Sequence, residues 1–215
     1  MEAGATLAEE IRMNVGIAIV AVVLSSFTLA VHAQERNASE NDSQRGEVAL
    51  SNDTLQLRYL GRDGAVGSGG QIMGTFFLSE ERDIVMSGAV LFPASLPDSM
   101  HLGQRLTLRF GPQVYAALLE EENNDVMAVS VGADVRFVVN RRMGLAISGQ
   151  AFYAPDILTF GSADSLTDLS ARVELQVAPE LLAFGGMRWF EFDLTEGGGE
   201  RTLQEELFFG VGYRF

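Results

Sequence analysis

From residue 48 to the C-terminus, apolar residues recur at every second position in one segment after another. Within residues 127–137 the odd positions are apolar, whereas the even positions are Ala, Ser, Gly, Asp and Arg. Residues 169–177 and 207–215 show the same alternation. Successive side chains of a strand point to opposite faces, so each segment predicts a strand with one apolar and one mostly polar face. Helical spacing is weak in this region, and the fold is therefore expected to be all-β.

Nine strands are clear from the pattern, and a short tenth is possible at their start. The nine are expected at residues 54–60, 71–78, 84–92, 105–118, 127–137, 144–153, 169–177, 181–192 and 207–215. Residues 48–51 add a tenth strand if they pair with residues 54–60, and removing residues 54–60 leaves eight. Pro112 lies inside one of these segments, where it weakens the strand or marks a bulge.

Alternation alone fits a soluble β-sandwich as well as a barrel, but three features favour an antiparallel transmembrane β-barrel of 8 to 10 strands. Many segments have 9 to 13 residues, which matches the ~9–11 residues of a tilted membrane-spanning strand. The polar faces combine small residues with charges of both signs. Aromatic residues fall at strand ends, with Tyr153 and Trp189 near long loops and Phe137 near the opposite ends, as interfacial girdles require. Both termini are expected in the periplasm, which makes the strand number even.

The N-terminus indicates export. Residues 15–31 form an apolar run of 17 residues that ends in Val31-His32-Ala33, which is the outline of a secretory signal peptide cleaved after Ala33. A transmembrane anchor is the alternative, but the run is short for a span and lacks a basic flank. We therefore expect a helical signal peptide at 1–33, a flexible periplasmic arm at 34–47 and a barrel at 48–215. Whether translation starts at Met1 or at Met13 stays open.

Composition excludes several classes of function. The net charge is −14 and all 15 basic residues are Arg, so no basic stripe is available for a nucleic-acid partner. The chain has no Cys and only two His, which removes disulfides, thiol catalysis and Cys-ligated zinc. No metal or other cofactor is expected.

The alternation also places charged residues on the inward face of the strands. Ten are predicted to point into the lumen: Arg105, Arg109, Asp134, Arg136, Asp168, Arg172, Glu174, Arg188, Glu206 and Arg214. Because buried charges must be paired, these are expected to form an ion-pair network that plugs a barrel whose interior is only wide enough for side chains. A barrel of ten strands would leave room for a narrow solute path, which is the channel alternative.

The C-terminal segment ends in an aromatic residue and has apolar residues at every second place before it. Leu207, Phe209, Val211, Tyr213 and Phe215 resemble the C-terminal assembly signal of Gram-negative outer-membrane barrels. That resemblance implies two partners, the outer-membrane lipid and the barrel assembly machinery, which would bind the last strand.

Three segments in the second half resemble the YfaZ family of small outer-membrane proteins. They are Phe152-Tyr153-Ala154-Pro155-Asp156, the run from Ser170 to Leu175, and the run from Phe184 to Phe190 with its Gly-Met-Arg-Trp step. The resemblance covers residues 54–215 and is interrupted by an insertion at residues 95–103. It implies an outer-membrane barrel without an established biochemical role and supplies no catalytic residues.

One sequence feature suggests catalysis instead. Asp98, Ser99 and His101 lie within four residues, which invites comparison with the triad of outer-membrane lipid hydrolases. Neighbours in sequence rarely have triad geometry, because the fold usually brings the members together. The sequence therefore favours a non-enzymatic outer-membrane barrel with a structural or surface-interaction role, ahead of a narrow channel and of a lipid hydrolase using His101.

Overall fold

The computed structural model describes residues 44–79, 83–95, 105–119, 124–161, 163–194 and 200–215. The described residues as far as Arg214 belong to one compact unit. The expected signal peptide, nearly all of the expected arm and His101 lie outside the described residues. In the part of the chain that is described, no helix is long and apolar enough to cross a membrane.

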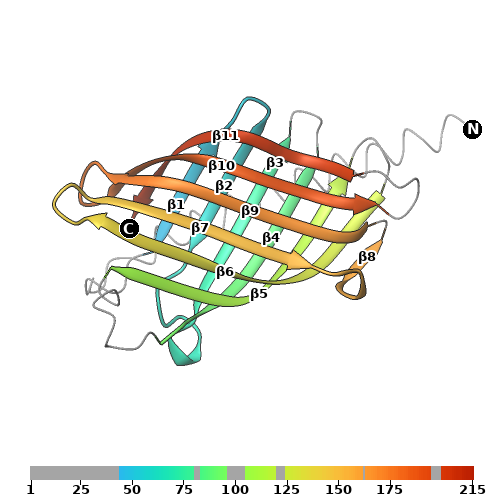
Figure 1. Ribbon diagram of the computed structural model, residues 1–215, viewed down its shortest axis with the longest axis horizontal. Helices are drawn as coiled ribbons and strands as arrows, with labels where there is room; N and C mark the ends of the chain where they lie inside the picture. The colour runs from blue at the N-terminus through green and yellow to red at the C-terminus, as the bar shows by residue number, and fades with distance from the viewer. Residues whose placement is uncertain (1–43, 80–82, 96–104, 120–123, 162, 195–199) are drawn as a thin grey trace, which may run out of the picture. The chain divides into compact units, whose positions relative to one another are not determined.

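Ten strands close into an antiparallel barrel, in agreement with the larger of the expected strand numbers. The ring consists of β1 (Arg45–Leu50), β2 (Thr54–Leu60), β3 (Gln71–Ser79), β4 (Ile84–Pro93), β5 (Leu106–Leu119), β6 (Asn124–Asn140), β7 (Leu145–Ala154), β9 (Ala163–Gln176), β10 (Leu181–Leu194) and β11 (Glu200–Arg214). Each strand is hydrogen-bonded to the next, and β11 returns to β1. Figure 1 shows the front strands, β6 to β11, crossing the back strands, β1 to β4, obliquely, as the tilt of strands in a barrel requires.

Closure depends on the short first strand. β1 pairs with β2 on one side and with β11 on the other, so that Val48 lies between Leu57 and Val211. The strand begins at Arg45, three residues before the expected start at residue 48. Because β1 includes Glu47, a residue assigned to the flexible arm on sequence grounds is part of the barrel wall.

An additional short strand, β8 (Thr159–Gly161), continues the line of β7 after an interruption. β7 pairs with β6 as far as Val131, and β8 pairs with β6 at residues 126–128. The 3-10 turn η2 (Asp156–Leu158) lies between them. The strands expected at residues 144–153 and 169–177 leave the residues between them as a connection, and this expectation was wrong because pairing resumes after the Pro155 step, in β8 and in the first residues of β9.

The two faces of the strands separate as the alternation predicted. The large apolar side chains of residues 127–135, 169–177 and 207–213 include many that are exposed on the outside of the barrel, with exposures between 54% and 67% for Leu207, Phe209, Val211 and Tyr213. Their neighbours along each strand are mostly buried or half-buried. The exposed apolar side chains form the lipid-facing band expected of an outer-membrane barrel.

Several strands extend further than the apolar pattern does. β9 begins at Ala163 instead of residue 169, and β11 begins at Glu200 instead of residue 207. These extensions are rich in Asp, Glu, Ser and Thr. Beyond the apolar band both faces of a strand can be polar, so the backbone ladder continues while the hydrophobic alternation ends.

Pro112 lies within β5 and does not produce a bulge. Between the pairs Ala89–Gln113 and Phe92–Phe110, the ladder to β4 has no bridges, but the register is the same on both sides of the gap. A Cβ on Gly111 would lie 1.9 Å from the carbonyl oxygen of Val90. Here β4 and β5 approach too closely for any residue with a side chain.

We predict that Val173→Arg destabilises the barrel because it places a charge on the outer wall, where Val173 is 51% exposed. The expected loss is ~2–4 kcal/mol for a charge at the middle of the bilayer. Urea unfolding of barrels folded into lipid vesicles measures it. Thr202→Arg, at an exposed position near the start of β11, is the matched control and should cost ~0–1 kcal/mol. Equal losses for the two variants would contradict the assigned facing.

Candidate functional site

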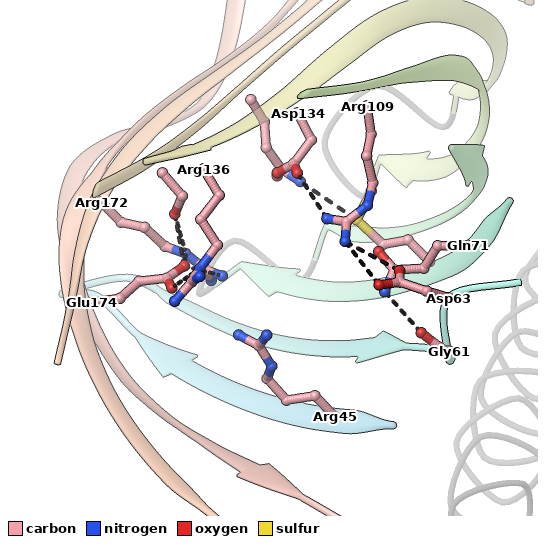
Figure 2. A network of polar contacts seen from close by, with 12 residues as sticks. Arg45, Gly61, Asp63, Gln71, Arg109, Asp134, Arg136, Arg172 and Glu174 are labelled. Carbon is pink, nitrogen blue, oxygen red and sulfur yellow. Dashed lines mark hydrogen bonds and ion pairs between the residues drawn. The ribbon is translucent and has the colours of Figure 1, made fainter. Parts of the chain in front are cut away.

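Charged side chains gather in the lumen in three clusters, parts of which are shown in Figure 2. We name them after one member each. The Glu47 cluster contains Arg45, Glu47, Arg136, Ser148, Arg172 and Glu174. The Asp168 cluster contains Gln56, Tyr115, Asp168 and Arg188. The Arg109 cluster contains Asp63, Arg109 and Asp134.

The Glu47 cluster joins two strands that are not neighbours in the wall, through Arg172. From β9, the Nη1 and Nη2 atoms of Arg172 donate to the two carboxylate oxygens of Glu47 on β1, at 2.6 and 3.1 Å. Nε of Arg172 donates to Glu174 Oε1 at 3.0 Å, and Nη2 lies 2.9 Å from the same oxygen. This fork geometry is the bidentate pairing that makes guanidinium–carboxylate contacts strong. One side chain therefore ties β1 to a strand three places away around the ring.

Glu174 is saturated by its neighbours. Its Oε2 accepts a hydrogen bond from Arg136 Nε at 2.8 Å, and its Oε1 accepts one from Ser148 Oγ at 2.7 Å. The side chain of Glu174 is 1% exposed and that of Glu47 is 2% exposed. Carboxylates at this depth remain charged only when they are paired and hydrogen-bonded, and the surrounding guanidinium groups meet that requirement.

The Asp168 cluster is a second connection across the lumen. Arg188 on β10 forms a bidentate pair with Asp168 on β9, with both N–O distances at 2.9 Å. The hydroxyl of Tyr115 on β5 donates to Asp168 Oδ2 at 2.8 Å, and Arg188 Nη1 donates to Gln56 Oε1 on β2 at 3.1 Å. Four strands that are not all neighbours thus meet at one ion pair.

Aromatic rings pack beside these ion pairs and fill the remaining width of the lumen. The guanidinium carbon of Arg188 lies 4.5 Å from the ring centre of Phe190, and that of Arg172 lies 4.7 Å from Phe184. Phe77, Tyr115 and Phe192 extend the cluster around Phe190. Cations over aromatic faces gain ~0.5–2 kcal/mol, the more so when they are desolvated.

The Arg109 cluster is more exposed to solvent than the other two clusters, and it binds the connection between β2 and β3 to the barrel wall. Arg109 Nη2 donates to Asp63 Oδ1 at 3.1 Å, and its Nη1 lies 3.5 Å from Asp134 Oδ1. Asp63 belongs to the connection between β2 and β3, which is also held by Gln71 Nε2 donating to the carbonyl of Gly61 at 2.8 Å. The side chain of Asp63 is 58% exposed, so this pair contributes little to stability by itself.

The predicted lumen residues differ in what surrounds them. The structure brings seven into ion pairs: Arg109, Asp134, Arg136, Asp168, Arg172, Glu174 and Arg188. Arg105 and Arg214 are exposed. Glu206 lies opposite Arg188 in the ladder, but Arg188 is paired with Asp168, and Glu206 Oε2 is buried without a hydrogen-bond donor among the described residues.

Sequence reasoning missed several members of these clusters, above all Glu47 and Tyr115, and it also missed Arg58, which is buried on β2. Glu47 was missed because the alternation was read from residue 48, although Arg45, Glu47 and Ala49 continue it on the inward face. Asp63 comes from a loop, where no period applies. Tyr115 was overlooked because an inward aromatic residue looks apolar until its hydroxyl finds a partner.

The predicted interfacial aromatics lie on the outer face. Tyr153 and Trp189 are 53% and 47% exposed, and the indole nitrogen of Trp189 donates to Glu191 at 2.6 Å. Phe137 is half-buried. An aromatic ring with a polar tip suits the membrane interface, which remains the predicted position of these residues.

Two small cavities lie among the residues that the structure describes. A cavity of about 10 Å³ is lined by Glu47, Ala49, Gln56, Arg58, Arg172, Phe184 and Phe208. A second one of the same size lies near the chain ends, beside Arg45 and Arg214. The described residues contain no group of three His, Cys, Asp or Glu side chains placed to hold a metal ion.

Comparison with known proteins gives one family and several remote structural likenesses. The model of a family described as YfaZ precursor matches residues 17–215. No curated protein matches the chain. A KdgM porin in complex with disordered oligogalacturonate is 9% identical, with a TM-score of 0.45 over 80% of this chain and 99% of that one. A NanC porin is 11% identical, with a TM-score of 0.38 over 81% of this chain and 98% of that one.

We predict that removing both partners of the Asp168–Arg188 pair costs less than the sum of removing each partner alone. Asp168→Leu or Arg188→Met alone leaves a buried, uncompensated charge and should cost about 3–5 kcal/mol of unfolding free energy. The double variant should be less destabilised than the sum of the two, with a coupling of at least about 1 kcal/mol. Urea unfolding of the four proteins closes the cycle. Simple additivity would show that the two side chains do not stabilise each other.

Proposed function

The chain belongs to the YfaZ family, and we propose that it acts in the Gram-negative outer membrane as a closed barrel with a structural or surface-interaction role. In this proposal the barrel neither conducts solutes nor carries out an enzymatic reaction. Its outer wall contacts lipid, and its lumen is filled by its own side chains.

The side chains that meet inside the described part of the barrel support this proposal. Long side chains reach from wall to wall at two levels, through Glu47 with Arg172 and through Tyr115 with Asp168. Phe77, Phe190 and Phe192 pack between them and are almost completely buried. Ten strands enclose more space than the eight that side chains fill easily, and Arg, Tyr and Phe are the residues large enough to fill it.

The chemistry of the lumen also supports a non-enzymatic role. Its most deeply buried carboxylates, Glu47, Asp168 and Glu174, each accept bonds from guanidinium groups. A general acid or base needs access to a substrate proton at hydrogen-bond distance. A cavity of about 10 Å³ beside Glu47 offers no room for such a substrate.

We expect no steady single-channel steps from the wild-type barrel in a planar lipid bilayer. Glu47→Ala/Arg172→Ala removes a paired anion and cation together and opens one level of the lumen, so small conductance steps should appear. Val173→Ala on the outer wall is the matched control and should remain silent. Steady steps from the wild-type protein would favour a narrow channel and overturn the proposal.

The last strand generates a further prediction about assembly. Leu207, Phe209, Val211 and Tyr213 form its exposed outer face, and we propose that this strand with Phe215 is read by the barrel assembly machinery. Deleting Phe215 should lower the amount of folded barrel in the membrane several-fold, measured as the band that shifts on boiling. Loss of one half-exposed ring costs only ~1–2 kcal/mol by area.

The control for this prediction extends the chain instead of shortening it. Adding one Ser after Phe215 retains every side chain of the last strand but displaces the terminal aromatic residue from the chain end. We expect the same assembly defect. Normal assembly of the extended protein would show that Phe215 acts through packing alone.

A further inference from the structure

Arg58 is a buried cation of the lumen whose environment the ion pairs of the described residues do not explain. It lies on β2, opposite Glu47 in the ladder, and its side chain points inward, where it is 8% exposed. Its Nε atom is buried without an acceptor among the described residues, and none of the ion pairs found there includes Arg58. A guanidinium group cannot escape this situation by losing its proton.

The carboxylates near Arg58 are already occupied. Glu47 accepts two bonds from Arg172 and a third, at 3.3 Å, from Arg45. Asp168 accepts hydrogen bonds from Nε and Nη2 of Arg188 and from the hydroxyl of Tyr115. Gln56, the inward neighbour of Arg58 on β2, accepts a hydrogen bond from Arg188 at its side-chain oxygen. The nearby acceptors are therefore oriented toward other donors.

Charges of both signs lie around Arg58 in the lumen. Five guanidinium groups, of Arg45, Arg58, Arg136, Arg172 and Arg188, lie with the carboxylates of Glu47, Asp168 and Glu174. Glu206 adds a fourth carboxylate opposite Arg188. Among the described residues Arg58 is the guanidinium group of these five for which no ion pair is found, and an unpaired charge inside a protein is strongly unfavourable.

Space for a counter-ion exists at the same place. Arg58 lines the cavity of about 10 Å³ that it shares with Arg172, Glu47 and the rings of Phe184 and Phe208. A cavity of that size holds one water-sized particle. Two guanidinium groups on its wall favour an anion over a cation, and the two aromatic rings leave no room for a polyatomic ligand.

We propose that the cavity beside Arg58 is a binding site for a single monatomic anion of the halide class, which neutralises Arg58 inside the barrel. The site is structural and goes beyond the proposed role of the barrel, because it requires only this cavity and its charges. A lone water molecule would satisfy the hydrogen bond of Nε but would leave the charge in place.

Bromide is the probe that tests this site. The barrel is refolded and crystallised in sodium bromide, and diffraction is recorded at the bromine absorption edge. An anomalous peak in the cavity beside Arg58 is the expected result. Electron density without an anomalous signal there would identify water and would overturn the proposal.

A stability measurement gives an independent readout. At equal ionic strength, the wild-type protein refolded in bromide should unfold at a temperature higher by on the order of 3 °C than in gluconate, because a ligand that binds only the folded state stabilises it. Arg58→Met removes the charge and should abolish the difference. Arg105→Met, at an exposed Arg, should retain it. Equal unfolding temperatures of the wild-type protein in the two salts would count against the site.

Discussion

Closure of the ring is the constraint from which the other features of this protein follow. Lipid offers no hydrogen bonds, so a sheet with an open edge cannot remain in the membrane. The six-residue strand β1 supplies the closure by pairing with β2 and β11 at once. The same strand brings Glu47 into the lumen, where its carboxylate accepts hydrogen bonds from Arg172 on β9, three strands away around the ring. Backbone closure and the ion-pair network therefore share one short segment.

Closure also decides what the inward side chains must do. Once the wall is complete, the lumen separates their charges from bulk water, and Arg side chains cannot become neutral. The carboxylates of Glu47, Asp168 and Glu174 pair with the guanidinium groups of Arg172 and Arg188 through bidentate or multiple hydrogen bonds. Phe184 and Phe190 lie under two of the guanidinium groups. A barrel filled in this way is held across its diameter as well as around its circumference.

The sequence predicted the fold well because one face of each strand contacts lipid. Val131, Val173 and Phe209 are exposed as expected, since period two survives wherever the outer face must be apolar. Prediction failed where the outer face is no longer required to be apolar: at the polar start of β11, at the Pro155 step between β7 and β8, and at Glu47. Partners such as Asp63 and Arg109, or Tyr115 and Asp168, are far apart in the chain. Their pairing depends on the curvature of the closed ring, which no local pattern encodes.

The most direct test of a filled lumen is the exchange of guanidinium protons with water. Nuclear magnetic resonance of the barrel in lipid nanodiscs, with labelled Arg, separates the Nε–H signals. The account predicts that Arg172 and Arg188, whose Nε atoms donate to Glu174 and Asp168, exchange slowly, whereas the exposed Arg105 and Arg214 exchange fast. Fast exchange at Arg172 and Arg188 as well would reveal a water-filled channel and would contradict the proposal that side chains fill the lumen.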